Sequence, residues 1–116
     1  MHAWLCENPV GVDALAWKEL PTPQPGPGQV LVEIKAASLN FPDILIVQNK
    51  YQIKPPLPFV PGSEYAGVVQ AVGEGVTHLK VGDRAAYASN PPGAYAELRE
   101  MPAKCVCRLP DAISFE

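Results

Sequence analysis

The chain has 116 residues, which is the size of a single domain, and a formal net charge of −3. It contains 14 prolines and 9 glycines. A proline inside a helix costs about 3 kcal/mol, and residues 62–90 form the only proline-free stretch longer than 15 residues. Because that stretch also holds five glycines, the sequence excludes a helical bundle and a doubly wound α/β domain, which needs several long helices.

Charge, hydropathy and cysteine content exclude several kinds of partner. The basic residues form no stripe, so we expect no nucleic acid partner. No apolar run has the length that crosses a membrane, and the N-terminus lacks the pattern of a secretory signal, so we expect no membrane association. The three cysteines are too few for a disulfide framework and fit a cytoplasmic location.

Short strands separated by proline and glycine turns are predicted along most of the chain. In chain order we expect strands at 2–7, 15–20 and 29–38, a short helix at 39–47, and strands at 63–72, 85–89, 94–99 and 104–109. The proline-rich segment 21–28 is predicted to be a rigid connector, with a polyproline ligand as the alternative. Strands about ten residues apart predict a small β-barrel or sandwich.

Four residues carry local expectations. Asp43 follows Pro42 in the first turn of the predicted helix, where the helix dipole stabilises a carboxylate. Gly67 lies inside a strand, which predicts a bulge or a close backbone approach. Cys105 and Cys107 share one face of a predicted strand, and we expect them to be small buried side chains and not a zinc pair.

Six segments then follow one another in a specific order: GQVLV (28–32), ASLNFPD (37–43), PGSEYAGVV (61–69), VGEGV (72–76), VGDR (81–84) and GAYAE (93–97). Together they resemble the N-terminal, GroES-like domain of the medium-chain dehydrogenase/reductase superfamily, in its zinc-free quinone oxidoreductase branch. The resemblance implies a mainly β fold, a partly open GroES-like β-barrel with one or two short helices, forming one domain over residues 1–116. The Rossmann domain of the family is expected to be missing, which makes the chain a fragment.

Two positions depart from the zinc-dependent members of this superfamily. The resemblance places Asn40 where those members have a zinc-binding cysteine, and Ser63 where they have a zinc-binding histidine. Neither side chain is a good zinc ligand, and a short turn at 88–93 replaces the structural-zinc lobe. We therefore expect no metal site. Without a Lewis acid, a conjugated acceptor is the expected substrate, because hydrogen-bond donors can stabilise its delocalised charge.

The same resemblance implies the site residues. Asn40 is expected to be catalytic and to contact the cofactor, with helix capping as the alternative role. Tyr51 is expected to be catalytic through its hydroxyl, or else to pack on nearby loop prolines. The substrate pocket is expected to include Phe41, Leu45, Tyr51 and Ser63.

Other residues are assigned structural roles. Asp43 is expected to stabilise its helix, and Glu64 to be buried or paired. Phe41 has core packing as its alternative to the pocket, and His2 is expected to be a solvated surface residue.

The expected function is that of the substrate-side domain of an NADPH-dependent, zinc-independent oxidoreductase that reduces a quinone or an α,β-unsaturated carbonyl compound. The full-length protein is expected to be a homodimer, whereas the isolated chain is expected to bind NADPH weakly and to lack turnover. Two alternatives stay open. One is a non-enzymatic GroES-like β-barrel that binds a partner, and the other is an enoyl-thioester reductase domain.

Overall fold

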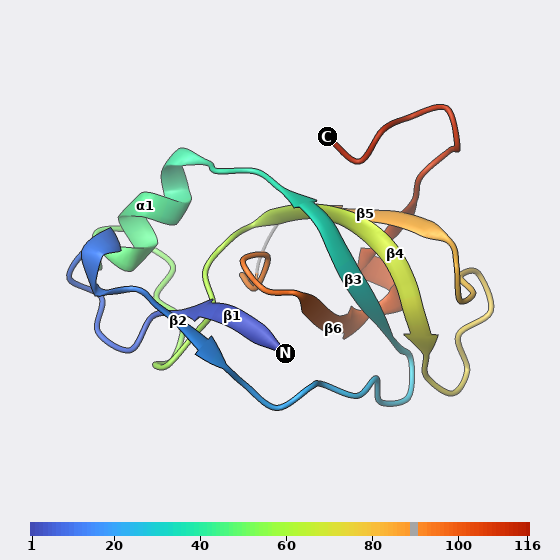
Figure 1. Ribbon diagram of the computed structural model, residues 1–116, viewed down its shortest axis with the longest axis horizontal. Coiled ribbons are helices and arrows are strands. Elements are labelled where there is room, and N and C mark those ends of the chain that lie inside the picture. Colours follow the sequence, from blue (N-terminus) through green and yellow to red (C-terminus); the bar gives the residue numbers. More distant parts are fainter. Residues whose placement is uncertain (89–90) are drawn as a thin grey trace.

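The computed structural model describes residues 1–88 and 91–116. Within these ranges the chain forms mostly short strands, with one α-helix and two turns of 3₁₀-helix (Figure 1). The elements are, in chain order, β1 (His2–Leu5), η1 (Val12–Ala14), β2 (Ala16–Glu19), β3 (Gln29–Ala37), α1 (Phe41–Val47), β4 (Glu64–Val72), β5 (Arg84–Ala88), β6 (Leu98–Pro102), η2 (Ala103–Cys105) and β7 (Cys107–Arg108). None of the helices in the described ranges is long and apolar enough to span a membrane.

The strands form two antiparallel sheets. Strands β1 and β2 pair as a hairpin, and the other five strands are ordered β6-β3-β4-β5-β7. Isolated bridges connect the hairpin end of the chain to segments outside both sheets, Ala3 to Ala96 and Cys6 to Phe59. Figure 1 shows the hairpin and α1 together at one end of the molecule, opposite the turn that connects β4 to β5. The predicted mainly β architecture is confirmed, and the described residues contain no βαβ unit.

The core lies between the curved strands of the larger sheet. Its buried cluster comprises Val30, Val32, Tyr65, Val69, Leu79, Ala85, Tyr87, Ala94, Met101, Ala103 and Val106. Val30 and Val32 lie two positions apart on β3, and Tyr65 and Val69 lie four apart on β4, so the period of two places each pair on one face. Full burial of each valine side chain stabilises the fold by about 1.5–3 kcal/mol.

Gly67 permits the closest approach between β3 and β4. A Cβ atom at this position would lie 2.0 Å from the carbonyl oxygen of Glu33, which no side chain could occupy. The pairing of the two strands also shifts register between Ile34 and Ala36, next to the partner of Gly67. The expected bulge or close approach at this glycine is confirmed.

Helix α1 is short and is fixed at both ends. The carboxyl group of Asp43 accepts the backbone N–H of Asn40 at 3.1 Å, which satisfies one free donor at the N-terminus. At the other end Asn49 has a left-handed φ of 58°, a conformation that commonly terminates a helix. A seven-residue helix is unstable alone, so the burial of Ile46 and Val47 against the rest of the domain holds it.

The predicted bounds of the last two strands are wrong. Residues 94–97 form a bridge to β1, where the N–H of Trp4 donates to the carbonyl of Tyr95 at 2.9 Å, and β6 begins only at Leu98. Residues 104–109 contain part of η2 and a two-residue strand. Cys105 and Cys107 are exposed, contrary to expectation, because Val106 between them faces the core.

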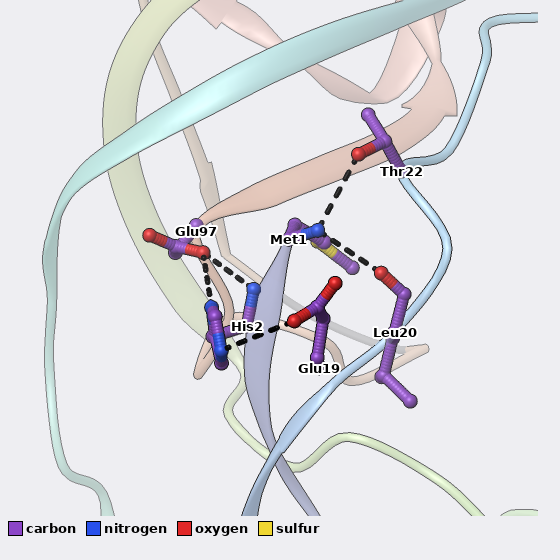
Figure 2. Close-up of polar contacts among 6 residues, drawn as sticks. All are labelled: Met1, His2, Glu19, Leu20, Thr22 and Glu97. Atoms are coloured by element: carbon purple, nitrogen blue, oxygen red, sulfur yellow. Dashed lines mark hydrogen bonds and ion pairs between the residues drawn. The ribbon is translucent and has the colours of Figure 1, made fainter.

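A cluster of polar contacts ties the N-terminus to the start of β6 (Figure 2); its members are Met1, His2, Glu19, Leu20, Thr22 and Glu97. The imidazole of His2 lies 3.9 Å from Glu19 and 3.5 Å from Glu97, and stacks on Trp17 with ring centroids 5.7 Å apart. The backbone N–H of His2 donates to Glu97 and lowers the pKa of that carboxyl. The His2 side chain is 44% exposed, as expected of a surface residue, and it also contacts β2 and the segment before β6.

Candidate functional site

A hydrogen-bond network surrounds the N-terminus of α1, and we name it the Asn40 network; its members are Ser38, Asn40, Asp43, Ser63, Glu64 and Tyr95. The Asn40 amide donates to Ser38 Oγ at 2.9 Å and to Glu64 Oε2 at 3.2 Å. Ser38 Oγ in turn donates to the same Glu64 oxygen at 2.6 Å. Since a side-chain amide has two N–H donors, both are used inside the network and fix the orientation of Asn40.

Asp43 is the buried centre of this network, with 5% of its surface exposed. Besides the N–H of Asn40, its carboxyl group accepts Ser63 Oγ at 2.5 Å and Tyr95 Oη at 3.0 Å. Burial and the neighbouring Asp43 raise the pKa of the Tyr95 phenol. A Cβ at Gly62 would approach the Tyr95 ring to 2.8 Å, so this glycine lets the ring lie against the backbone. Buried carboxyl groups need such donors to offset desolvation.

Glu64 is the exposed end of the network. It was expected to be buried or paired; it is hydrogen-bonded but exposed to solvent. The hydrogen bonds from Ser38 and then from Asn40 lower the pKa of its carboxyl group. Glu64 therefore carries a negative charge at neutral pH, directly beside the Asn40 amide.

An apolar cavity of about 880 Å³ opens beside the network, and we name it the hairpin cavity. Its apolar walls come from β1, β2, β3 and α1, and include Trp4, Trp17, Ile34, Leu39, Phe41 and Ile44. Asn40, Asp43 and Tyr95 also line it. A large apolar cavity with a few polar groups is the usual form of a small-molecule site.

A second cavity, of about 550 Å³, lies across the end of β3, and we name it the thiol cavity. It is lined by Ser38 and Glu64 of the Asn40 network and, on its far side, by Tyr87, Cys105, Cys107 and Phe115. Ala36 and Ala37 line both cavities. The end of β3 and the Asn40 network therefore form the wall between the two cavities.

The structure brings together some of the predicted site residues. Asn40 and Phe41 both line the hairpin cavity, and Phe41 is 74% exposed, so its alternative assignment to the core is wrong. Ser63 joins the network through Asp43 and lines neither of the two cavities. Leu45 and Tyr51 are half-buried and lie outside the residues that line them. The catalytic and pocket roles of all five residues stay predictions.

Four network members were not assigned as site residues from the sequence: Asp43 and Glu64 were expected to be structural, and Ser38 and Tyr95 were given no role. Ser38 precedes Asn40 by two positions. In an extended chain this spacing places both side chains on the same side, so the sequence could have indicated that Ser38 lies beside Asn40. Tyr95 reaches Asp43 across 52 positions of sequence, and only the folded barrel shows that contact.

Asn40 and Ser63, which the resemblance implied to stand in place of zinc ligands, are both engaged in hydrogen bonds of the network. Among the described residues there is no group of three or more histidines, cysteines and carboxylates arranged to hold a metal ion. The turn expected at 88–93 includes residues 89–90, which lie outside the described residues, so the missing structural-zinc lobe stays a prediction.

Residues 26–111 match the family model of the alcohol dehydrogenase GroES-like domain. The chain belongs to this family. The expected fold class, a mainly β, partly open GroES-like barrel with a short helix, is therefore confirmed.

The relatives are several times longer than this chain. It is 44% identical over 106 residues to quinone oxidoreductase of Pseudomonas aeruginosa, which covers 91% of this chain and 32% of that protein. It is 46% identical over 94 residues to the synaptic vesicle membrane protein VAT-1 homolog of Rattus norvegicus, covering 81% and 23%. The structure of Escherichia coli quinone oxidoreductase complexed with NADPH superimposes with a TM-score of 0.92 and 37% identity, covering 99% and 35%. The domain bounds 1–116 stay a prediction.

Proposed function

We propose that this domain forms the substrate side of an NADPH-dependent oxidoreductase that transfers hydride to a quinone or an α,β-unsaturated carbonyl compound. The observation that carries the proposal is the position of Asn40, whose oriented amide lies on the wall of a mostly apolar cavity. The similarity to quinone oxidoreductases, one of them complexed with NADPH, supports the reaction class and the cofactor.

NADPH, when bound, supplies the hydride. Asn40 fits a residue that contacts the polar end of this cofactor, because it is exposed and its side chain is held by two acceptors. The glycines at 73 and 75 do not fit the dinucleotide fingerprint, since they connect β4 to β5 and not a strand to a helix. The rest of the cofactor site is therefore proposed to lie outside this chain.

Asn40 is also the residue proposed to stabilise the reacting substrate. Hydride addition to a conjugated acceptor develops negative charge on its oxygen, which a positioned N–H donor stabilises. The bond from Asn40 to Glu64 is the longer of its two side-chain bonds, at 3.2 Å, and faces solvent. We propose that a substrate oxygen replaces the Glu64 carboxylate as acceptor, while Ser38 keeps the amide in place.

The apolar walls of the hairpin cavity suit the remainder of such a substrate. Phe41 and the two tryptophans offer aromatic faces to a quinone ring. A simple ketone gains little from these walls, and its reduction needs stronger stabilisation of the alkoxide than an amide gives. We therefore propose conjugated acceptors as substrates, without a metal ion.

The test is a comparison of acceptors. The open reading frame that contains these residues would be expressed, and NADPH oxidation followed with 1,4-benzoquinone, an enone, an enoyl thioester and a simple ketone. We expect reduction of the quinone or enone and little reduction of the ketone, with no turnover by the 116-residue chain alone. Equal rates with the ketone would contradict the proposal, and preference for the thioester would support an enoyl-thioester reductase.

Identity alone does not select the function, because the quinone oxidoreductase and the VAT-1 homolog are almost equally similar to this chain. The second candidate is a non-enzymatic GroES-like module, because the fold by itself does not fix the function. If none of the four acceptors supported NADPH oxidation, this second candidate would be favoured. We further propose a homodimer for the full-length protein and a cytoplasmic location, to be tested by light scattering and by cell fractionation.

A further inference from the structure

Two exposed thiols lie on one side of the chain between β6 and the C-terminus. Val106 has extended backbone angles, φ −108° and ψ 130°, and is 5% exposed within the core. Side chains alternate along an extended chain, so Cys105 and Cys107 both point away from that core. Both are free and exposed.

Both thiols open into the thiol cavity. The cavity has apolar and aromatic walls from Tyr87, Leu109 and Phe115. Phe115 is held there by Arg84, whose guanidinium carbon lies 4.3 Å from the ring centroid. The same guanidinium donates to the carbonyl of Pro110 at 2.9 Å, which fixes the C-terminal tail beside the cavity.

Cys6 provides an internal contrast. It is fully buried, and its backbone pairs with that of Phe59. Burial raises the pKa of the Cys6 thiol, and a buried thiol in apolar surroundings is a poor nucleophile. One chain therefore holds two accessible thiols beside a cavity and one protected thiol.

We propose that Cys105 and Cys107 form a covalent acceptor site for quinones and α,β-unsaturated carbonyl compounds, with the ring of the electrophile resting in the thiol cavity. The thiolate is the attacking form of cysteine, and both exposed thiols line the cavity. An aromatic electrophile would stack on Phe115. The addition requires no NADPH, although Ser38 and Glu64 of the Asn40 network also line this cavity.

The reaction is an addition that balances by itself. The sulfur of either cysteine forms a bond to a ring carbon of the quinone, and the displaced electron pair moves to a carbonyl oxygen, which takes up a proton. The substituted ring carbon then transfers its hydrogen, as a proton, to the second oxygen, giving a hydroquinone thioether. With an enone the proton ends on the carbon next to the carbonyl group. No further oxidant or reductant takes part.

The first experiment uses the unmodified 116-residue chain without NADPH. The chain would be treated with 1,4-naphthoquinone, and its intact mass and proteolytic peptides measured over time. We expect thioether adducts at Cys105 and Cys107 while Cys6 stays unmodified, and no adduct in C105S/C107S. Adducts at Cys6 at an equal rate, or none at the exposed pair, would overturn the proposal. Because NADPH oxidation is not measured, this result is independent of the proposed function.

The second experiment tests whether the cavity takes part. The adduct rate with naphthoquinone is divided by the rate with iodoacetamide, a small electrophile that needs no aromatic wall. We expect Phe115→Ala to lower this ratio about two- to tenfold, the range of one aromatic contact. The matched control Val81→Ala changes a residue that is 62% exposed and lines neither cavity, and should leave the ratio unchanged. If the ratio of the naphthoquinone rate to the iodoacetamide rate is unchanged in Phe115→Ala, the thiols react without binding the ring in the cavity, and the proposal is overturned.

Discussion

Asp43 and Glu64 are two carboxyl groups of one hydrogen-bond network in opposite environments. Asp43 is 5% exposed and accepts three hydrogen bonds, of which those from Ser63 and Tyr95 come from distant parts of the chain. Glu64 is exposed and accepts two hydrogen bonds from Ser38 and Asn40. The buried Asp43 therefore joins the helix to the barrel. The exposed Glu64 accepts a hydrogen bond from Asn40, and a ligand can take its place as that acceptor.

The largest expected effect comes from the buried centre. Asp43→Ala removes the acceptor of three donors, and hydrogen bonds to charged groups contribute about 1.5–3 kcal/mol each. We expect a loss of roughly 3 kcal/mol or more in the free energy of unfolding, measured with urea. Glu64→Ala should cost below about 1 kcal/mol, the range of exposed charge pairs. If both variants lost the same free energy of unfolding, the proposed difference between the buried Asp43 and the exposed Glu64 would be contradicted.

The next largest effect is expected for Asn40 and is measured as a change in catalytic efficiency. In the protein expressed from the complete reading frame, Asn40→Ala should lower kcat/KM for a quinone by about 10²-fold, the usual cost of losing one positioned donor. The unfolding midpoint of the same variant should change little, because the Asn40 side chain is exposed. Asn40→Asp, which cannot donate at neutral pH, should resemble the alanine variant. Activity equal to that of the unmodified protein would exclude Asn40 from the reaction.

Substitution of Tyr95 measures how much its hydrogen bond to Asp43 contributes to stability. Tyr95→Phe removes a hydroxyl that donates to Asp43 and reaches the carbonyl of Ser38, and should cost about 1 kcal/mol. Tyr51→Phe is the matched control, since no contact joins the Tyr51 hydroxyl to the network among the described residues. Its effect should stay within about 0.5 kcal/mol. A larger loss in the control would mean that Tyr51 supports the fold.

The smallest expected effect is the pH dependence of Glu64. Hydrogen bonds from Ser38 and Asn40 lower its pKa in the folded state below the usual 4.5, so the stabilisation is present above that value and is lost as the pH falls through the folded pKa. Between about pH 5 and pH 3 the unfolding free energy of the unmodified chain should therefore decrease more than that of Glu64→Gln. The measurement is urea unfolding at several pH values. Parallel pH profiles would show that the bonds to Ser38 and Asn40 contribute nothing to stability.

Much of the fold could be predicted from local pattern. The alternation in 29–38 and 63–72 gave both long strands of the barrel, and Pro42 with Asp43 gave the helix start. The later strands were displaced, because residues 94–97 alternate like a strand but form a bridge to the N-terminal hairpin. Cys105 and Cys107 were correctly predicted to share one face. That face was wrongly predicted to be buried, because Val106 between them packs into the core.

The candidate site was predictable only in part. Asn40, Phe41 and Ser63 were proposed from the sequence, and the structure places Asn40 and Phe41 on one cavity and Ser63 on Asp43. The two cavities and the exposure of the thiols depend on side chains from strands far apart in the chain, which no local pattern encodes.

The sequence by itself determined a proline-punctuated β domain, because proline and glycine act on the backbone locally. The tertiary structure decided which of the two carboxyl groups is buried. That choice follows from Tyr95 and Ser63, which approach Asp43 across 52 and 20 positions of sequence and satisfy it away from water. Among the described residues, Glu64 accepts side-chain hydrogen bonds from the exposed Ser38 and Asn40, and it lies at the surface.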